Sequence, residues 1–165
     1  MRQLDHLLTQ YKSRGILIDT NLLLLFVVGM YDPKRIPKFK RTAKFTVEDF
    51  YILAEFFDFF SRIVTTPNIL TEVSNLAGQL PENLKPAFYP LFAQHLTLLE
   101  EHYLTSANIA SAPQFAKLGL TDCGILELSR NQYLVLTDDF RLAGHLDSQG
   151  IDVINFNHIR TMNWS

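Results

Sequence analysis

Short apolar runs alternate along the chain with helical segments, and this alternation limits the possible folds more than any other feature. The predicted strands are Ile16–Ile18, Ile63–Thr65, Tyr133–Thr137 and Ile151–Phe156. Such apolar runs are typical of strands that are buried on both faces of a sheet. Because parallel strands need helical crossovers between them, the pattern predicts an α/β sandwich with a parallel sheet.

The other segments divide into helices and loops. Thr46 and Thr66 can each cap a helix, and Pro67 suits a first helical turn. Segments 31–45 and 105–113 are predicted as loops, the first because it holds two prolines and six basic residues. The predicted helices span residues 1–14, 21–29, 47–62, 67–77, 81–103, 114–130 and 139–149, the sixth as one helix or a broken pair.

The composition fits one folded domain that covers residues 1–165. Apolar residues make up 47% of the chain and charged residues 19%, which is not a disordered composition. The net charge of −2 gives no overall attraction for nucleic acid, so any such binding must come from a local patch.

Three features indicate a soluble cytoplasmic protein with no membrane contact. Cys123 is the single cysteine, which excludes an intramolecular disulfide and suits a reducing compartment. The first 14 residues are mixed and polar, unlike a signal peptide. The apolar run Leu22–Met30 is far shorter than the roughly 20 residues that a membrane span needs.

Carboxylates follow two of the predicted strands. Asp19 lies inside the apolar run GILIDTNLLLLF, where burying an unpaired carboxylate would cost several kcal/mol. Asp138 and Asp139 directly follow the strand that ends at Thr137. Ligand sites of open parallel sheets lie beyond the carboxyl ends of the strands, so these acids are expected at one edge.

Two further acids are candidates for the same site. Glu72 falls on the flank of the apolar stripe of its helix, and Asp122, with Thr121, is predicted to cap a helix. Each acid also has an ordinary explanation, because Asp122, Asp138 and Asp139 can be helix caps and Glu72 a solvated helix charge. If the acids gather, their repulsion demands a cation, and a set of oxygen ligands without Cys or His indicates Mg²⁺ or Mn²⁺.

Four segments together resemble the acidic motifs of PIN-domain nucleases. They read LIDTNLLL, TPNILTEVSNL, GLTDCGIL and YLVLTDDFRLA, and their order and spacing are similar to the family pattern from Gly15 to about Asn155. The resemblance implies a three-layer α/β/α sandwich around a small, mostly parallel sheet. It also implies metal-dependent hydrolysis of RNA that leaves a 5′-phosphate and a 3′-hydroxyl.

The resemblance also assigns roles to individual residues. The four catalytic acids would be Asp19, Glu72, Asp122 and Asp139. Asp19, Asp122 and Asp139 would hold the metal ion, with Asp138 as an accessory ligand, because the last motif of the family usually reads Thr-x-Asp. Asn21 and Thr137 would orient the carboxylates or a substrate phosphate.

The segment 31–45 is basic and looks longer than in minimal members of the family, as does 80–113. It is interpreted as a phosphate clamp for RNA, with Phe39 or Phe45 available to stack on a base. Alternatively, the basic residues of this segment are only a solvated charge run, or they form a surface for an acidic partner protein. Its basic residues are Lys34, Arg35, Lys38, Lys40, Arg41 and Lys44.

The sequence therefore predicts an Mg²⁺- or Mn²⁺-dependent ribonuclease, with the toxin of a toxin–antitoxin pair among the roles open to it. The alternative is a catalytically inactive PIN-fold module that binds RNA or protein. A phosphoacceptor domain is disfavoured because no lysine follows the last strand, and an Asp-x-Asp phosphatase because Asn21 replaces the second acid. An antitoxin is one possible partner. A homodimer is expected because the helix Leu22–Met30 and the Phe-rich helix 47–62 exceed the needs of one small core.

Overall fold

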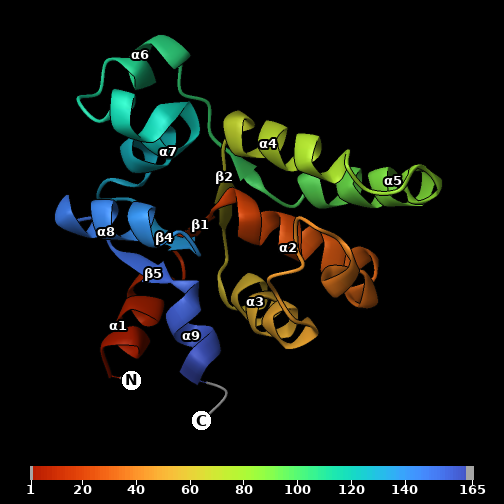
Figure 1. Ribbon diagram of the computed structural model, residues 1–165. Coiled ribbons are helices and arrows are strands. Elements are labelled where there is room, and N and C mark those ends of the chain that lie inside the picture. The colour runs from red at the N-terminus through yellow and green to blue at the C-terminus, as the bar shows by residue number, and fades with distance from the viewer. Residues whose placement is uncertain (1, 163–165) are drawn as a thin grey trace.

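The computed structural model describes residues 2–162 and confirms the predicted fold class (Figure 1). Within these residues the strands form one all-parallel, five-stranded sheet in the order β3-β2-β1-β4-β5. Helices α2 to α5 lie on one side of the sheet and α6 to α8 on the other, as in a three-layer α/β/α sandwich. The strands are β1 (Ile16–Ile18), β2 (Ile63–Thr65), β3 (Glu100–Glu101), β4 (Leu134–Thr137) and β5 (Val153–Asn155).

The helices agree with the predicted segments in most places. Gly119 interrupts α7 with a φ of 78°, which agrees with a broken pair of helices over 114–130. The α-helices are α1 (Arg2–Tyr11), α2 (Thr20–Tyr31), α3 (Val47–Phe59), α4 (Pro67–Ala77), α5 (Lys85–Leu96), α6 (Ser106–Ala110), α7 (Phe115–Ser129), α8 (Phe140–Ser148) and α9 (Phe156–Met162), and the 3₁₀ helices are η1 (Pro33–Lys38) and η2 (Glu82–Leu84).

Three predicted segments are wrong in part. The helix 81–103 ends early, and its last residues form β3, which pairs with β2 through Val64 and Glu100. The loop 105–113 contains α6, which Thr105 caps by accepting a hydrogen bond from the Asn108 N–H at 3.3 Å. The last strand ends at Asn155 rather than Phe156, because the Asn155 side chain accepts the Asn157 N–H at 3.0 Å and starts α9.

Helix α2 forms the centre of the core. Residues 22–29 are all buried within the chain, because α3, α4, α5 and η1 surround the helix. Phe26 stacks on Phe57 of α3, with ring centroids 3.6 Å apart. The apolar residues 22–29 of α2 are thus used inside one chain, whereas Met30 and, in α3, Tyr51 and Phe59 are exposed. Self-association stays a prediction. No helix in the described part of the chain is long and apolar enough to span a membrane.

The segment 31–45 is more ordered than a plain loop, because η1 and buried side chains anchor it. The Thr42 hydroxyl donates to the Ile36 carbonyl at 2.8 Å, and both residues are fully buried. Phe39 is 5% exposed and Phe45 2% exposed. The prediction that these two rings can stack on a base is therefore wrong, because they are part of the core.

Candidate functional site

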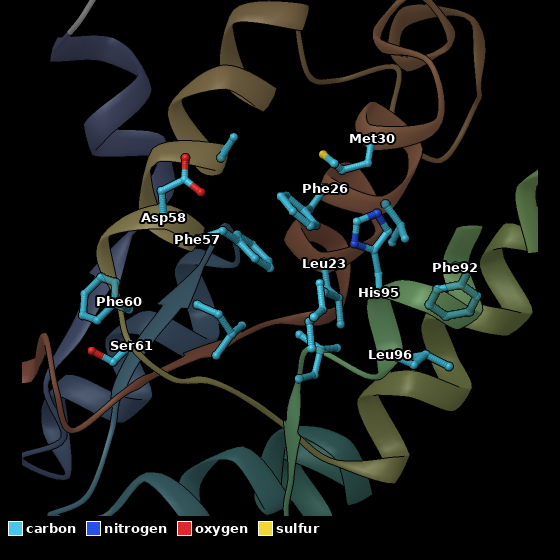
Figure 2. Close-up of a pocket in the computed structure, with 15 residues that line it drawn as sticks. Leu23, Phe26, Met30, Phe57, Asp58, Phe60, Ser61, Phe92, His95 and Leu96 are labelled. Atoms are coloured by element: carbon cyan, nitrogen blue, oxygen red, sulfur yellow. The ribbon is translucent and has the colours of Figure 1, made fainter. Parts of the chain in front are cut away.

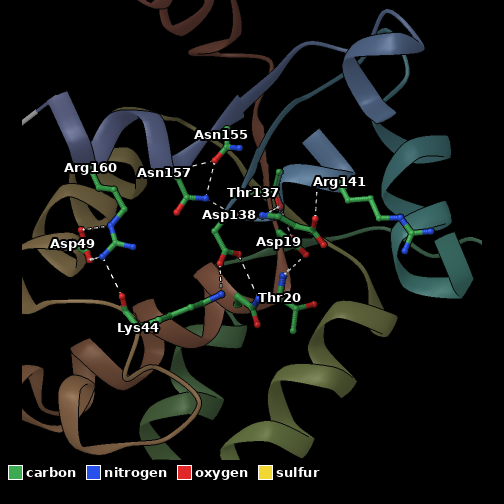
Figure 3. Close-up of polar contacts among 12 residues, drawn as sticks. Asp19, Thr20, Lys44, Asp49, Thr137, Asp138, Arg141, Asn155, Asn157 and Arg160 are labelled. Atoms are coloured by element: carbon green, nitrogen blue, oxygen red, sulfur yellow. Dashed lines mark hydrogen bonds and ion pairs between the residues drawn. The ribbon is translucent and has the colours of Figure 1, made fainter. Parts of the chain in front are cut away.

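The carboxyl ends of β1 and β4 bring the predicted strand-end acids together. The two strands are neighbours in register, with Ile18 opposite Leu136, and the Asp19 N–H donates to the Leu136 carbonyl at 3.0 Å. Asp138 and Asp139 come directly after β4, at the same edge of the sheet as Asp19. Figure 3 shows Asp138 beside Asp19.

Asp19 is held firmly and is almost fully buried, with 6% exposure. Its Oδ1 accepts the Thr20 N–H at 2.7 Å, and its Oδ2 accepts the Thr137 hydroxyl at 2.5 Å. Asp19 is the N-cap of α2, so a capping role accounts for part of its position. Because each carboxylate oxygen has two acceptor sites, both oxygens can still accept a further ligand.

Glu72 connects the Asp19 and Asp122 segments. Its Oε2 accepts the Thr20 hydroxyl at 3.0 Å, and its Oε1 accepts the Thr121 hydroxyl at 2.7 Å. The sequence predicts Thr121 as a helix cap, but within residues 2–162 its hydroxyl accepts no backbone N–H. The carboxylate of Asp122 accepts no hydrogen bond within the same residues, so it is available to a ligand.

The adjacent aspartates after β4 differ in environment. Asp139 is exposed and caps α8, with its Oδ1 accepting the N–H groups of Arg141 and Leu142 at 2.8 and 3.1 Å. Asp138 is buried, and it accepts the Asn21 side-chain amide at 3.4 Å and forms an ion pair with Lys44. The capping explanation therefore holds for Asp139 and not for Asp138.

Burial and mutual repulsion change the acidity of two of these groups. Burial, with a smaller effect of Asp138 and Asp139, raises the pKa of Asp19 from 3.8 to about 6. Burial is also the largest cause of the raised pKa of Asp122, which is about 7. The negative charges of Asp19, Asp139 and Glu72 raise this pKa further. The site is thus an acidic cluster in which added positive charge would relieve repulsion.

This cluster predicts that stability falls as pH rises. Between about pH 4 and pH 7 the folded carboxyls of Asp19 and Asp122 bind more protons than the unfolded ones, because their pKa values are raised. The free energy of unfolding must then decrease with pH across this window. We expect the melting temperature in EDTA to decrease from pH 5 to pH 8, and Mn²⁺ to restore it at pH 8. Equal melting temperatures at both pH values, with no effect of Mn²⁺, would show that repulsion among these acids does not destabilise the fold.

The carboxylates fit Mg²⁺ or Mn²⁺ by their chemistry, although they do not form a closed ligand cage. Within residues 2–162, no group of three or more His, Cys, Asp or Glu side chains lies close enough to coordinate one ion directly. Mg²⁺ keeps several waters and uses only one or two carboxylates directly. An ion held partly through water would suit the spread of Asp19, Asp122 and Asp139.

One residue of the basic segment reaches the acidic cluster. Lys44 pairs with Asp138, while Arg41 donates from Nε to Gln79 at 2.7 Å. Within residues 2–162, no hydrogen bond or ion pair joins the side chains of the other four to the acids, and Lys34, Lys38 and Lys40 are exposed. Their role as a phosphate clamp stays a prediction.

Two residues near the cluster were not among the sequence candidates. Arg160 of α9 donates from Nε to Asp49 Oδ1 at 3.0 Å and from Nη2 to the Lys44 carbonyl at 3.1 Å, which fixes the Lys44 backbone (Figure 3). Asn157 donates from Nδ2 to the Asp138 carbonyl at 2.7 Å. The sequence does contain a signal for α9, because Asn155 can cap a helix that starts with the apolar Phe156 and continues to Ile159. Recognising this helix would have pointed to Asn157 and Arg160.

One hollow lies away from the acids. It is an apolar groove of about 490 Å³ between α2, α3 and α5, and none of the five acids lines it (Figure 2). Met30 is 44% exposed and Leu98 75% exposed at this groove. The groove therefore carries two of the exposed large apolar side chains of the described residues.

Comparisons with known proteins found no matching family model, no matching curated protein and no matching solved structure.

Proposed function

We propose that the protein is a metal-dependent ribonuclease of the PIN-domain type. The observation that carries this proposal is the meeting of acids from four separate segments at the carboxyl edge of a parallel sheet. Two of these acids, Asp19 and Asp122, have pKa values raised to about 6 and 7. Perturbed carboxylates gathered in this way are typical of functional sites.

Asp19, Asp122 and Asp139 would hold the metal ion, with Asp138 as an outer ligand. When bound, Mg²⁺ or Mn²⁺ would supply an activated water and neutralise charge on the phosphodiester. Thr137 and Thr20 fix the orientation of Asp19 through the contacts described above. The two threonine hydroxyls on Glu72 leave its carboxylate fixed at the edge of the cluster, where it would position a water.

Lys44 would act first as a counterion for Asp138 and then as a contact for the substrate. Its side chain is 53% exposed while that of Asp138 is 4% exposed, so the ammonium group lies at the solvent side of the pair. A metal ion near Asp138 would compete with the ammonium group for the carboxylate. Lys44 could then pair with an RNA phosphate next to the cleaved bond.

Cleavage of RNA by the purified protein tests this function. We expect hydrolysis of a single-stranded RNA oligonucleotide in Mg²⁺ or Mn²⁺, no hydrolysis in EDTA, and products with 5′-phosphate ends. The control is a DNA oligonucleotide of the same sequence in the same buffers. Metal-independent hydrolysis, or products with 2′,3′-cyclic phosphates, would contradict the proposal.

The second candidate is a catalytically inactive module that binds RNA or protein. The ion pair of Lys44 with Asp138 and the lack of a closed ligand cage within residues 2–162 favour it. RNA binding without cleavage in any metal would support this module. We also propose a cytoplasmic location and an antitoxin or other protein as a partner. Self-association is proposed as well, with the apolar groove between α2, α3 and α5 as the candidate surface.

A further inference from the structure

Phe140 is an exposed aromatic residue at the edge of the acidic cluster. It directly follows Asp139 at the start of α8 and is 64% exposed. The edge-on ring of His158 lies beside it, with centroids 5.9 Å apart and planes at 62°. Single exposed apolar side chains are common on proteins, so the ring alone indicates nothing.

The surroundings of Phe140 distinguish it from an ordinary exposed side chain. A hollow of about 410 Å³ is lined by Phe140, Asn157, Arg160 and Thr161. The same Asn157 donates to the Asp138 carbonyl at 2.7 Å, so the hollow shares a wall with the acidic cluster. Because Phe140 also directly follows Asp139, the hollow lies next to the chain segment that carries two of the acids.

A fixed cation completes the hollow. The Arg160 side chain is 21% exposed, and it binds Asp49, whose side chain is fully buried, through both Nε and Nη2. Within the described residues its Nη1 makes no hydrogen bond and is free to donate to a ligand oxygen. An aromatic face beside a fixed guanidinium is the pattern that binds single-stranded nucleic acid, through base stacking and phosphate contacts.

We propose that Phe140 and the hollow it shares with Asn157, Arg160 and Thr161 form a base-binding subsite. One unpaired base next to the cleaved phosphodiester stacks on the Phe140 ring, and Arg160 contacts the phosphate of that nucleotide. This inference rests on the proposed function, because it places an RNA phosphodiester at the acids. It makes Phe140 a residue that positions a nucleotide beside the cleavage site without selecting its base.

Binding of short single-stranded RNA in EDTA tests the subsite separately from cleavage. Base stacking on an aromatic ring contributes enough that Phe140→Ala should weaken binding roughly 5- to 150-fold, whereas Phe140→Tyr should bind as the wild type does. Repulsion by the acids is the same in all these proteins, so it cancels in the comparison. Leu98→Ala is the matched control, because Leu98 is 75% exposed and lies at the apolar groove away from the acids.

An RNA series with one abasic nucleotide, moved along the strand, distinguishes stacking from a structural effect. The wild type should lose affinity when the abasic nucleotide falls at one position, and Phe140→Ala should show no such dependence. Wild-type affinity in Phe140→Ala, an unchanged position dependence in that variant, or no RNA binding at all would overturn the subsite. Binding as expected without cleavage in Mn²⁺ would overturn the ribonuclease function and leave the subsite in place.

Discussion

Replacing Asp19 by asparagine should abolish Mn²⁺-dependent cleavage of RNA without weakening the fold. Asparagine keeps the size of the side chain and an oxygen that can accept the Thr20 N–H, so α2 stays capped. It removes a negative charge that the metal ion needs. It also removes a buried carboxylate whose pKa is raised to about 6, so the melting temperature at pH 8 in EDTA should equal or exceed that of the wild type.

The measurement combines cleavage rate with thermal unfolding of the same preparations. Asp122→Asn should give the same result, because burial, with the charges of Asp19, Asp139 and Glu72, raises the pKa of Asp122 to about 7. Asp58→Asn is the matched control, since Asp58 is an exposed carboxylate at the distant apolar groove. Full activity in the purified Asp19→Asn protein would show that the cluster is not catalytic.

Asp139→Asn should be severely impaired even at high Mn²⁺, whereas Asp138→Asn should keep measurable activity. The charge of Asp139 raises the pKa values of both Asp19 and Asp122, whereas that of Asp138 contributes only to Asp19. Asp139 is therefore close enough to interact electrostatically with both of the other proposed ligands. Loss of an outer partner such as Asp138 typically weakens metal affinity about 10- to 100-fold.

Cleavage rates measured against Mn²⁺ concentration separate these two aspartates. Asp138→Asn should reach a rate near that of the wild type at a higher Mn²⁺ concentration, because only metal affinity falls. An inactive Asp138→Asn with a nearly normal Asp139→Asn would mean that the fourth motif is shifted by one residue. If neither substitution matters, the end of β4 is not part of an active site.

The sequence predicts the strands that bury apolar side chains on both faces. β1 and β2 have the predicted bounds, and β4 differs by one residue, because runs such as Ile16–Ile18 carry their own strand preference. β3 has no such signal, since Glu100 and Glu101 form a strand only by pairing with the edge of β2. Tertiary pairing of this kind depends on the assembled sheet and cannot be read from local residues.

The candidate site was predictable to a similar extent. Asp19, Asp138 and Asp139 follow from the topology, because they directly follow neighbouring parallel strands. The hydrogen bonds of Glu72 to Thr20 and Thr121 depend on how α4 packs against α7, which no local pattern contains. The same holds for Lys44, because the position of its backbone depends on Arg160 in the unpredicted helix α9.

Sequencing the RNA ends that form in cells after brief expression tests whether the acidic cluster cleaves RNA. Wild type and Asp19→Asn should be expressed to equal levels, and the 5′-monophosphate ends compared across all transcripts. We expect new ends at defined positions with the wild type and none of them with Asp19→Asn. The same set of ends in both samples would contradict a ribonuclease that depends on this acidic cluster.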